Sequence, residues 1–159
     1  MTPSLADPSV DLISGCSSGI GKALCWAFHQ QGYRVIATAR RPEALTDLGQ
    51  AGITTLPLDV TDRAAIHQVV ETILTTEKRI DLLINNAGYG QFGPLMDIKE
   101  SHLQQQFATN VFAPLAMAQA VAPVMRSQSA GTIVNIGSVS GTVTTPFAGT
   151  YCASKAALH

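Results

Sequence analysis

The chain has 159 residues, of which 46% are hydrophobic and 13% charged, and its formal net charge is −1. This composition excludes an intrinsically disordered chain, which combines low hydrophobicity with high net charge. Ten basic and eleven acidic residues leave no basic footprint for binding nucleic acid. The length fits a single domain, which we take as residues 1–159.

Targeting signals and metal ligands are not evident in the sequence. The amino-terminal segment lacks the basic and apolar regions of a signal peptide. No apolar run approaches the roughly 20 residues of a membrane span. Three cysteines without a CxxC spacing indicate reduced thiols in a cytoplasmic protein. Four scattered histidines offer no metal-ligand spacing, so we expect no metal site.

Short apolar runs alternate with longer segments of helical pattern along the chain. We expect strands at residues 10–14, 34–38, 53–58, 80–84 and 131–136. We expect helices at residues 20–31, 42–48, 62–76 and 100–125, and a last helix at residues 150–159. Gly32 is placed to end the first helix, and Thr61 is a candidate N-cap for the third.

The strands are continuous apolar runs, which are typical of strands buried on both faces of a parallel sheet. Strand–helix alternation then predicts right-handed βαβ units and hence an α/β, doubly wound sheet, although alternation alone also fits other α/β topologies. Asp11 does not fit easily, because a buried acid needs a partner and the sequence identifies none.

A glycine-rich segment with the spacing GxxxGxG joins the first strand to the first helix. Glycines allow a tight turn and close approach to a pyrophosphate, and a helix N-terminus offers free N–H groups and a positive dipole end to the anion. An ordinary Gly-rich turn is the alternative, and the position between strand and helix disfavours it. The residues assigned to cofactor binding here are Gly15, Ser17, Ser18, Gly19, Ile20 and Gly21.

The second strand is not followed by the acid that commonly holds an adenosine ribose. Arg40 and Arg41 stand there instead, and the nearest acid is Glu43. A guanidinium can bind a 2′-phosphate through paired charge-assisted hydrogen bonds. We therefore predict that NADPH is preferred over NADH, with Arg40 as the principal contact and Arg41 as a secondary one. The alternative is a pair of solvated surface arginines.

Six motifs follow one another along the chain. They are Gly15-x3-Gly19-x-Gly21, Asp59-Val60, Asn85-Asn86-Ala87-Gly88, Asn110, Ser138 and Tyr151-x3-Lys155. Their order and spacing resemble those of the short-chain dehydrogenase/reductase family, from about residue 10 to the end of the chain. The resemblance implies an NADP(H)-dependent oxidoreductase that transfers a hydride between the nicotinamide and a carbonyl or secondary alcohol, as a homodimer or homotetramer when complete. With it we predict a Rossmann-like parallel sheet of order 3-2-1-4-5, and a cofactor crevice at the carboxyl ends of the first and fourth strands, where the strand order reverses.

The resemblance assigns catalytic roles to four residues. Tyr151 and Lys155 are four residues apart and so lie on one face of a helix. A phenol exchanges protons poorly near neutral pH unless a neighbouring ammonium favours the phenolate, so Tyr151 is the expected general acid and base. Ser138 would bind the substrate oxygen, and Asn110 would support a proton relay through water. Lys155 would also bind the nicotinamide ribose, and we count both Tyr151 and Lys155 as cofactor contacts.

Two further segments resemble cofactor-binding parts of the family. Asn86, Ala87 and Gly88 would line the cofactor cleft, and Asp59 with Val60 would contact the adenine. Asn and Gly also end strands for backbone reasons, which is the alternative for these positions. Taken singly, each catalytic candidate could equally be an ordinary surface residue, so the prediction depends on the set.

The substrate is the least defined part of this prediction. The apolar segment 143–147 is expected to form one wall of its pocket and hints at a steroid-, retinoid- or acyl-lipid-like compound. The chain stops four residues beyond Lys155, so we expect it to lack the carboxyl-terminal strands of the family and to be inactive alone, with the fifth strand as a sheet edge. A cofactor-binding sensor without turnover, or an inactive fragment, are the alternatives to an enzyme.

Overall fold

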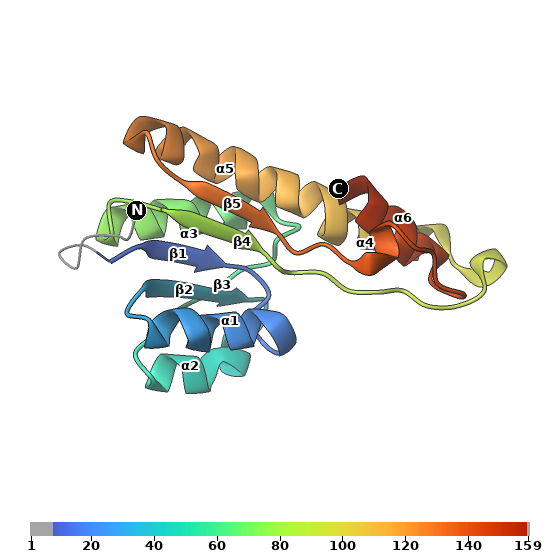
Figure 1. Cartoon of the computed structure of the whole chain (residues 1–159), viewed down its shortest axis with the longest axis horizontal. Coiled ribbons are helices and arrows are strands. Elements are labelled where there is room, and N and C mark those ends of the chain that lie inside the picture. The colour runs from blue at the N-terminus through green and yellow to red at the C-terminus, as the bar shows by residue number, and fades with distance from the viewer. Residues whose placement is uncertain (1–7, 159) are drawn as a thin grey trace.

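The computed structural model describes residues 8–158 (Figure 1). The amino-terminal segment, in which we predicted no signal peptide, and His159, the predicted end of the last helix, lie outside these residues. Five parallel strands form one sheet in the order β3-β2-β1-β4-β5, as predicted. The strands are β1 (Val10–Ile13), β2 (Arg34–Ala39), β3 (Thr54–Pro57), β4 (Leu82–Asn85) and β5 (Thr132–Asn135).

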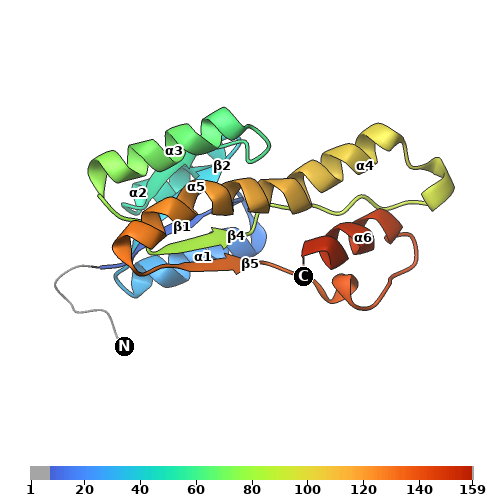
Figure 2. The same cartoon turned by 90° about the horizontal axis from the view of Figure 1, so that it is seen from above.

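Helices cover the sheet on both faces (Figure 2). They are α1 (Gly19–Gln30), α2 (Thr46–Gln50), α3 (Arg63–Thr76), α4 (Glu100–Phe107), α5 (Ala113–Gln128) and α6 (Gly149–Leu158), with short 3₁₀ turns η1 (Pro42–Leu45), η2 (Leu95–Asp97) and η4 (Val139–Gly141). Val10 and Leu12 of β1 belong to the core formed with α3 and α5. Ile13, on the opposite face, belongs to the core formed with α1 and α2. The positions of β1 that face the two helix layers are therefore apolar except for the buried Asp11.

Two strands do not match the predicted burial on both faces. All four residues of β5 are exposed, with Ile133 and Val134 each 37% accessible, and β3 is only partly buried. β5 is at the edge of the sheet, and within residues 8–158 no strand pairs with its outer side. The apolar run of β5 thus predicted the strand correctly but its burial wrongly, because burial depends on what covers the strand.

The third helix begins one residue later than predicted. Its N-cap is Asp62 and not Thr61, because the Asp62 carboxylate accepts hydrogen bonds from the N–H groups of Ala64 and Ala65 at 2.8 and 3.2 Å. The end of α1 is as predicted: Gly32 follows it with a φ of 84°, and its N–H donates to the His29 carbonyl.

The predicted helix at residues 100–125 is one continuous helical run that includes a π-helical turn. This turn, η3 (Ala108–Phe112), joins α4 to α5. By length and composition the run Glu100–Gln128 could cross a membrane, contrary to the sequence-based expectation. That is weak evidence, because core helices of soluble proteins pass the same test, and α5 here contacts α3, β4 and β5.

Asp11 of β1 has a partner that the sequence did not identify. The Ser9 hydroxyl donates to its carboxylate at 2.5 Å, and the side chain is only 1% accessible. Burial, with a smaller contribution from the nearby charge of Asp81, raises the pKa of Asp11 from 3.8 to about 6. The hydrogen bond from Ser9 offsets only part of this increase.

Candidate active site

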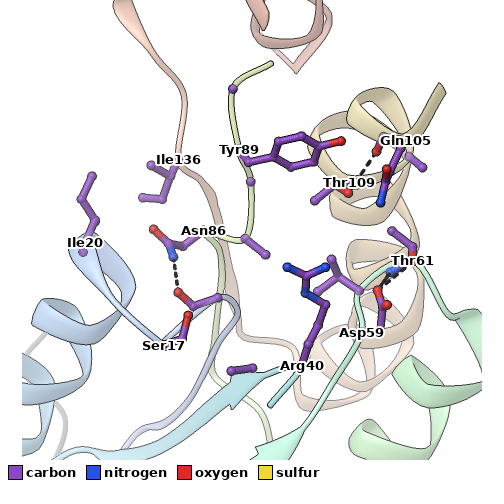
Figure 3. Close-up of a pocket in the computed structure, with 18 of the residues that line it drawn as sticks. Ser17, Ile20, Arg40, Asp59, Thr61, Asn86, Tyr89, Gln105, Thr109 and Ile136 are labelled. Atoms are coloured by element: carbon purple, nitrogen blue, oxygen red, sulfur yellow. Dashed lines mark hydrogen bonds between the residues drawn. The ribbon is translucent and has the colours of Figure 1, made fainter. Parts of the chain in front are cut away.

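A cleft of about 770 Å³ opens at the carboxyl ends of the central strands, where we predicted the ligand site. Its walls come from the loops after β1, β2, β3, β4 and β5 and from α4 and α6 (Figure 3). Thirteen of the predicted site residues line it: Gly15, Ser17, Ser18, Gly19, Ile20, Arg40, Asp59, Val60, Asn86, Ala87, Gly88, Tyr151 and Lys155. Four others, Gly21, Arg41, Asn110 and Ser138, are not among the residues that line it.

The loop after β1 is fastened to the loop after β4. The Asn86 side-chain amide donates to the carbonyls of Ser14 and Gly15 at 3.0 Å each, and the Ser14 hydroxyl accepts from the Asn86 and Ala87 N–H groups at 3.1 Å each. Gly15 has a φ of 72°, and a Cβ there would lie 2.7 Å from the Ala87 Cα. Only glycine allows this approach, so the two loops form one rigid floor.

The amino end of α1 faces the cleft with free backbone N–H groups. Its N-cap, Ser18, makes no side-chain capping hydrogen bond. Ser17, Ser18 and Gly19 are exposed, and nothing lies within 4 Å of the position a Gly19 Cβ would take. Unsatisfied N–H groups and the positive end of the helix dipole together make a site for an anion such as a phosphate.

Charged and polar side chains lie at the ends of β2 and β3. Figure 3 shows the Arg40 side chain in the cleft, near Asp59 and Thr61 and below Tyr89. The hydrogen bond from the Thr61 N–H is the main cause that lowers the pKa of Asp59, and the Arg40 charge adds to it. Partial burial raises the pKa of Tyr89, against the effect of the same guanidinium. Arg40 thus faces both groups, yet within residues 8–158 it forms no ion pair.

Tyr151 and Lys155 reach the cleft from α6. The Lys155 ammonium donates to the Ile136 carbonyl at 2.7 Å, and the residue is 6% accessible. Burial lowers the pKa of Lys155. The Tyr151 ring lies against the Phe92 ring, with centroids 6.0 Å apart. Both residues of the predicted pair therefore line the same cleft from one helix.

Asn110 and Ser138 do not line the cleft but lie next to residues that do: Asn110 contacts the loop after β4, and Ser138 directly follows Gly137 of the cleft wall. The Asn110 amide oxygen accepts from the Tyr89 N–H at 3.1 Å, and its NH₂ donates to the Tyr89 carbonyl and the Ser154 hydroxyl at 2.9 and 3.0 Å. Asn110 thus links the loop after β4 to α6 from the π-helical turn. The Ser138 hydroxyl accepts from the Ser140 N–H at 3.1 Å and begins η4.

Several cleft residues were missed by reasoning from the sequence. They are Thr61, Tyr89, Gly90, Gln91, His102, Gln105 and Thr109, all on the cleft wall. Tyr89 directly follows a predicted motif, and Gln105 and Thr109 are four apart on a helix beside Asn110, so adjacency and helical spacing are the signals available. Within residues 8–158, no group of three or more His, Cys, Asp or Glu side chains is placed to hold a metal ion.

Comparison with known proteins identifies the class to which this fold and cleft belong. Residues 9–159 match the short chain dehydrogenase family. The chain is 45% identical over 150 residues to the short-chain dehydrogenase ptmH of Penicillium ochrochloron, covering 92% of this chain and 55% of that protein. It is 39% identical over 152 residues to a 3-ketodihydrosphingosine reductase of Bacteroides thetaiotaomicron, covering 96% of this chain and 55% of that protein.

Solved structures agree with this result. A short-chain dehydrogenase from Streptomyces avermitilis superposes with a TM-score of 0.92 at 39% identity, over 96% of this chain and 57% of that one. A metagenomic short-chain oxidoreductase in complex with NADP superposes with a TM-score of 0.88 at 33% identity, over 96% of this chain and 72% of that one. The chain belongs to the short-chain dehydrogenase/reductase family. It spans about half the length of the curated relatives it matches.

Proposed function

We propose that the full-length protein is an NADP(H)-dependent oxidoreductase acting on a carbonyl or secondary alcohol. One observation carries the proposal: a single cleft is lined by Tyr151 and Lys155 and also by the amino end of α1 and Arg40. A proton-transfer pair and an anion-binding pair in one cleft are what hydride transfer with a phosphorylated dinucleotide requires.

The residues present fit such a cofactor. The uncapped N-terminus of α1 and the open space at Gly19 suit a pyrophosphate. The Arg40 guanidinium, which has no ion-pair partner within residues 8–158, suits a 2′-phosphate. We assign adenine contacts to Asp59 and Val60. A structural neighbour in complex with NADP supports the same choice of cofactor.

We assign the proton-transfer step to Tyr151. When bound, the nicotinamide supplies or accepts the hydride. The Tyr151 hydroxyl donates a proton to the carbonyl oxygen in reduction and accepts one from the alcohol in oxidation. Lys155, held at the Ile136 carbonyl, supplies the positive charge that stabilises the phenolate left after donation.

Ser138 and Asn110 have supporting roles in this proposal. In its bond with Ser140 the Ser138 hydroxyl is the acceptor, so its proton can still be donated to a substrate oxygen. Asn110 uses its amide to hold the loop after β4 against α6, and thereby keeps Tyr151 in place.

We propose that the substrate is apolar. Exposed large hydrophobic residues gather on the segments that flank Tyr151, and they are Phe92, Val139, Val143 and Phe147. None of these four residues, including those of the predicted wall 143–147, is among the residues that line the cleft, although the Phe92 ring lies against that of Tyr151. Exposed apolar side chains on segments next to a polar reacting group favour a substrate with a hydrocarbon body. One relative is named as a 3-ketodihydrosphingosine reductase, and this name specifies a ketone as the substrate of that protein.

We also propose that the full-length protein assembles as a homodimer or homotetramer. Phe112, the last residue of η3, and Leu115, near the start of α5, are 58% and 53% accessible. Large apolar side chains exposed on one long helix suit a contact between copies. Light scattering of the full-length protein measures the assembly, and a monomer would contradict it.

Cofactor binding and turnover test the proposed function together. Dissociation constants of NADPH and NADH are measured by nicotinamide fluorescence for the full-length protein, Arg40→Ala and the matched control Arg41→Ala. Arg40→Ala is expected to reduce the NADPH preference by about ten- to a hundredfold, because hydrogen bonds to charged groups contribute about 1.5–3 kcal/mol. Arg41 does not line the cleft, so Arg41→Ala should change the preference less.

Equal binding of NADPH and NADH by the wild-type protein would contradict the NADP(H) assignment. NADPH binding without reduction of any carbonyl would support a cofactor-binding sensor.

A further inference from the structure

An acid stands next to the arginine on which the NADPH preference depends. Asp59 is close enough to Arg40 for the guanidinium to affect its titration, and both side chains line the cleft. An acid in this position can pair with the guanidinium and so neutralise the charge needed for a phosphate. A carboxylate aimed at the same space would also repel the phosphate directly.

Thr61 holds this acid by two hydrogen bonds. Its backbone N–H and its hydroxyl both donate to one carboxylate oxygen, Asp59 Oδ1, at 2.9 and 2.7 Å. These bonds stabilise the ionised carboxylate in one orientation. Figure 3 shows the two dashed contacts on the Thr61 side of Asp59, with the Arg40 side chain approaching from the other side.

The Thr61 hydroxyl has no role in starting the helix that follows. Asp62 caps α3 and satisfies the first free N–H groups, of Ala64 and Ala65. The Thr61 hydroxyl instead points back to Asp59, two residues earlier. The position that looked like a helix cap in the sequence is therefore available for a different task.

We propose that Thr61 is a positioning residue for cofactor specificity: it restrains Asp59 and thereby leaves Arg40 available for the 2′-phosphate of NADP(H). This inference rests on the proposed NADP(H) preference. It concerns only the discrimination between NADPH and NADH, because the 2′-phosphate is the group that distinguishes them.

The test is the ratio of the NADH and NADPH dissociation constants in the full-length protein. Thr61→Ala removes one of the two hydrogen bonds, and the ratio should fall by about two- to tenfold, mainly through weaker NADPH binding. Thr61→Ser keeps the hydroxyl and should restore the wild-type ratio. Thr75→Ala on α3, where the hydroxyl donates to the Glu71 carbonyl far from the cleft wall, is the matched control and should leave the ratio unchanged.

A double substitution separates this role from a general structural one. In an Asp59→Asn background the competing charge is absent, so adding Thr61→Ala should no longer change the ratio. An unchanged ratio in Thr61→Ala, equal weakening of both cofactors, or the same change in the Asp59→Asn background would overturn the inference while leaving the proposed function intact. A wild-type protein without NADPH preference would overturn both. Thermal unfolding of each variant shows whether it is still folded. If Thr61→Ala is not folded, the ratio of dissociation constants in Thr61→Ser is compared with that of the wild type.

Discussion

The first and fifth strands have similar apolar sequences but opposite environments. All four residues of β1 are buried, between α1 and α2 on one face and α3 and α5 on the other. All four residues of β5 are exposed, at the edge of the same sheet. Both strands pair in parallel with β4, but β1 also pairs with β2 and is covered by helices on both faces, whereas within residues 8–158 no strand pairs with the outer side of β5.

This contrast divides the cleft into two parts. The loops after β1, β2 and β3, which we assign to the cofactor, extend from a closed core. The loop after β5 and α6, which carry Ser138, Tyr151 and Lys155, extend from the open edge. The cofactor side is thus supported by packing on both faces, while the catalytic side is supported mainly by contacts with α4, η3 and η4.

The largest expected effect is on kcat, and it tests whether the catalytic side and the cofactor side of the cleft act separately. Tyr151→Phe in the full-length protein should lower kcat by about 10²–10⁴-fold, because the proton donor is lost. NADPH binding should stay nearly unchanged, because the cofactor side is intact. Steady-state kinetics and fluorescence titration measure the two quantities, with Tyr33→Phe, beyond the far end of α1, as the matched control. Wild-type turnover in Tyr151→Phe would remove its assigned role.

Truncation of one isoleucine in each environment tests the difference in burial. Ile36→Ala, in the buried strand β2, should reduce the free energy of unfolding by about 2–5 kcal/mol. Ile133→Ala, in the exposed strand β5, should cost about 1 kcal/mol or less in the 159-residue chain. Chemical denaturation measures both. Equal costs would show that β5 is covered in solution, by a second copy or by another element.

A comparison of substitutions at Gly15 and Gly32 separates the cost of a steric contact from the cost of backbone strain. Gly15→Ala and Gly32→Ala both place a side chain at positive φ, which costs about 1–2 kcal/mol. Only Gly15→Ala adds a contact with Ala87, so its total cost should be larger by about 1–3 kcal/mol. Thermal or chemical unfolding measures the difference, and NADPH titration should show weaker binding only for Gly15→Ala. Equal losses of unfolding free energy in the two variants would contradict the close contact between the loops after β1 and β4.

The smallest expected effect concerns the buried acid of β1. Because the pKa of Asp11 is raised from 3.8 to about 6, the folded state binds more protons than the unfolded state between these values. The free energy of unfolding should therefore fall as pH rises through this window, by at most about 3 kcal/mol. Asp11→Asn should remove this pH dependence and stabilise the protein at neutral pH. Unfolding measured at a series of pH values checks this, and an identical pH profile in the variant would contradict it.

The sequence predicted much of the fold because it contains local and periodic signals. Apolar runs indicated all five strands, Gly32 indicated the end of α1, and the alternation of elements together with the family resemblance predicted the sheet order. The N-cap of α3 was placed one residue early, because Thr61 and Asp62 are both good capping residues and only the backbone geometry selects between them. The π-helical turn within the long helix also had no signal in the sequence.

The sequence predicted the cleft residues in the loops that follow the strands, but it did not predict those on α4. Gly15, Arg40 and Asn86 were identified because motif residues at strand ends meet at one edge of a parallel sheet, and Tyr151 and Lys155 because of their four-residue spacing and the family resemblance. The α4 residues that close the cleft were missed, because their place depends on how α4 extends beyond the sheet (Figure 2). Side-chain contacts between distant segments do not follow from spacing along the chain.

By itself, the sequence determined the element order, the strand pairing order and the family, since these depend on periodicity, connection handedness and motif spacing. Only the tertiary structure decided that β5 is exposed, that Asp11 is bonded to Ser9, and that Thr61 turns toward Asp59 instead of capping α3. The physical reason is that burial and hydrogen-bond choice depend on which neighbours are present in space. A local pattern states what a residue can do, and the packing around it selects one of those possibilities.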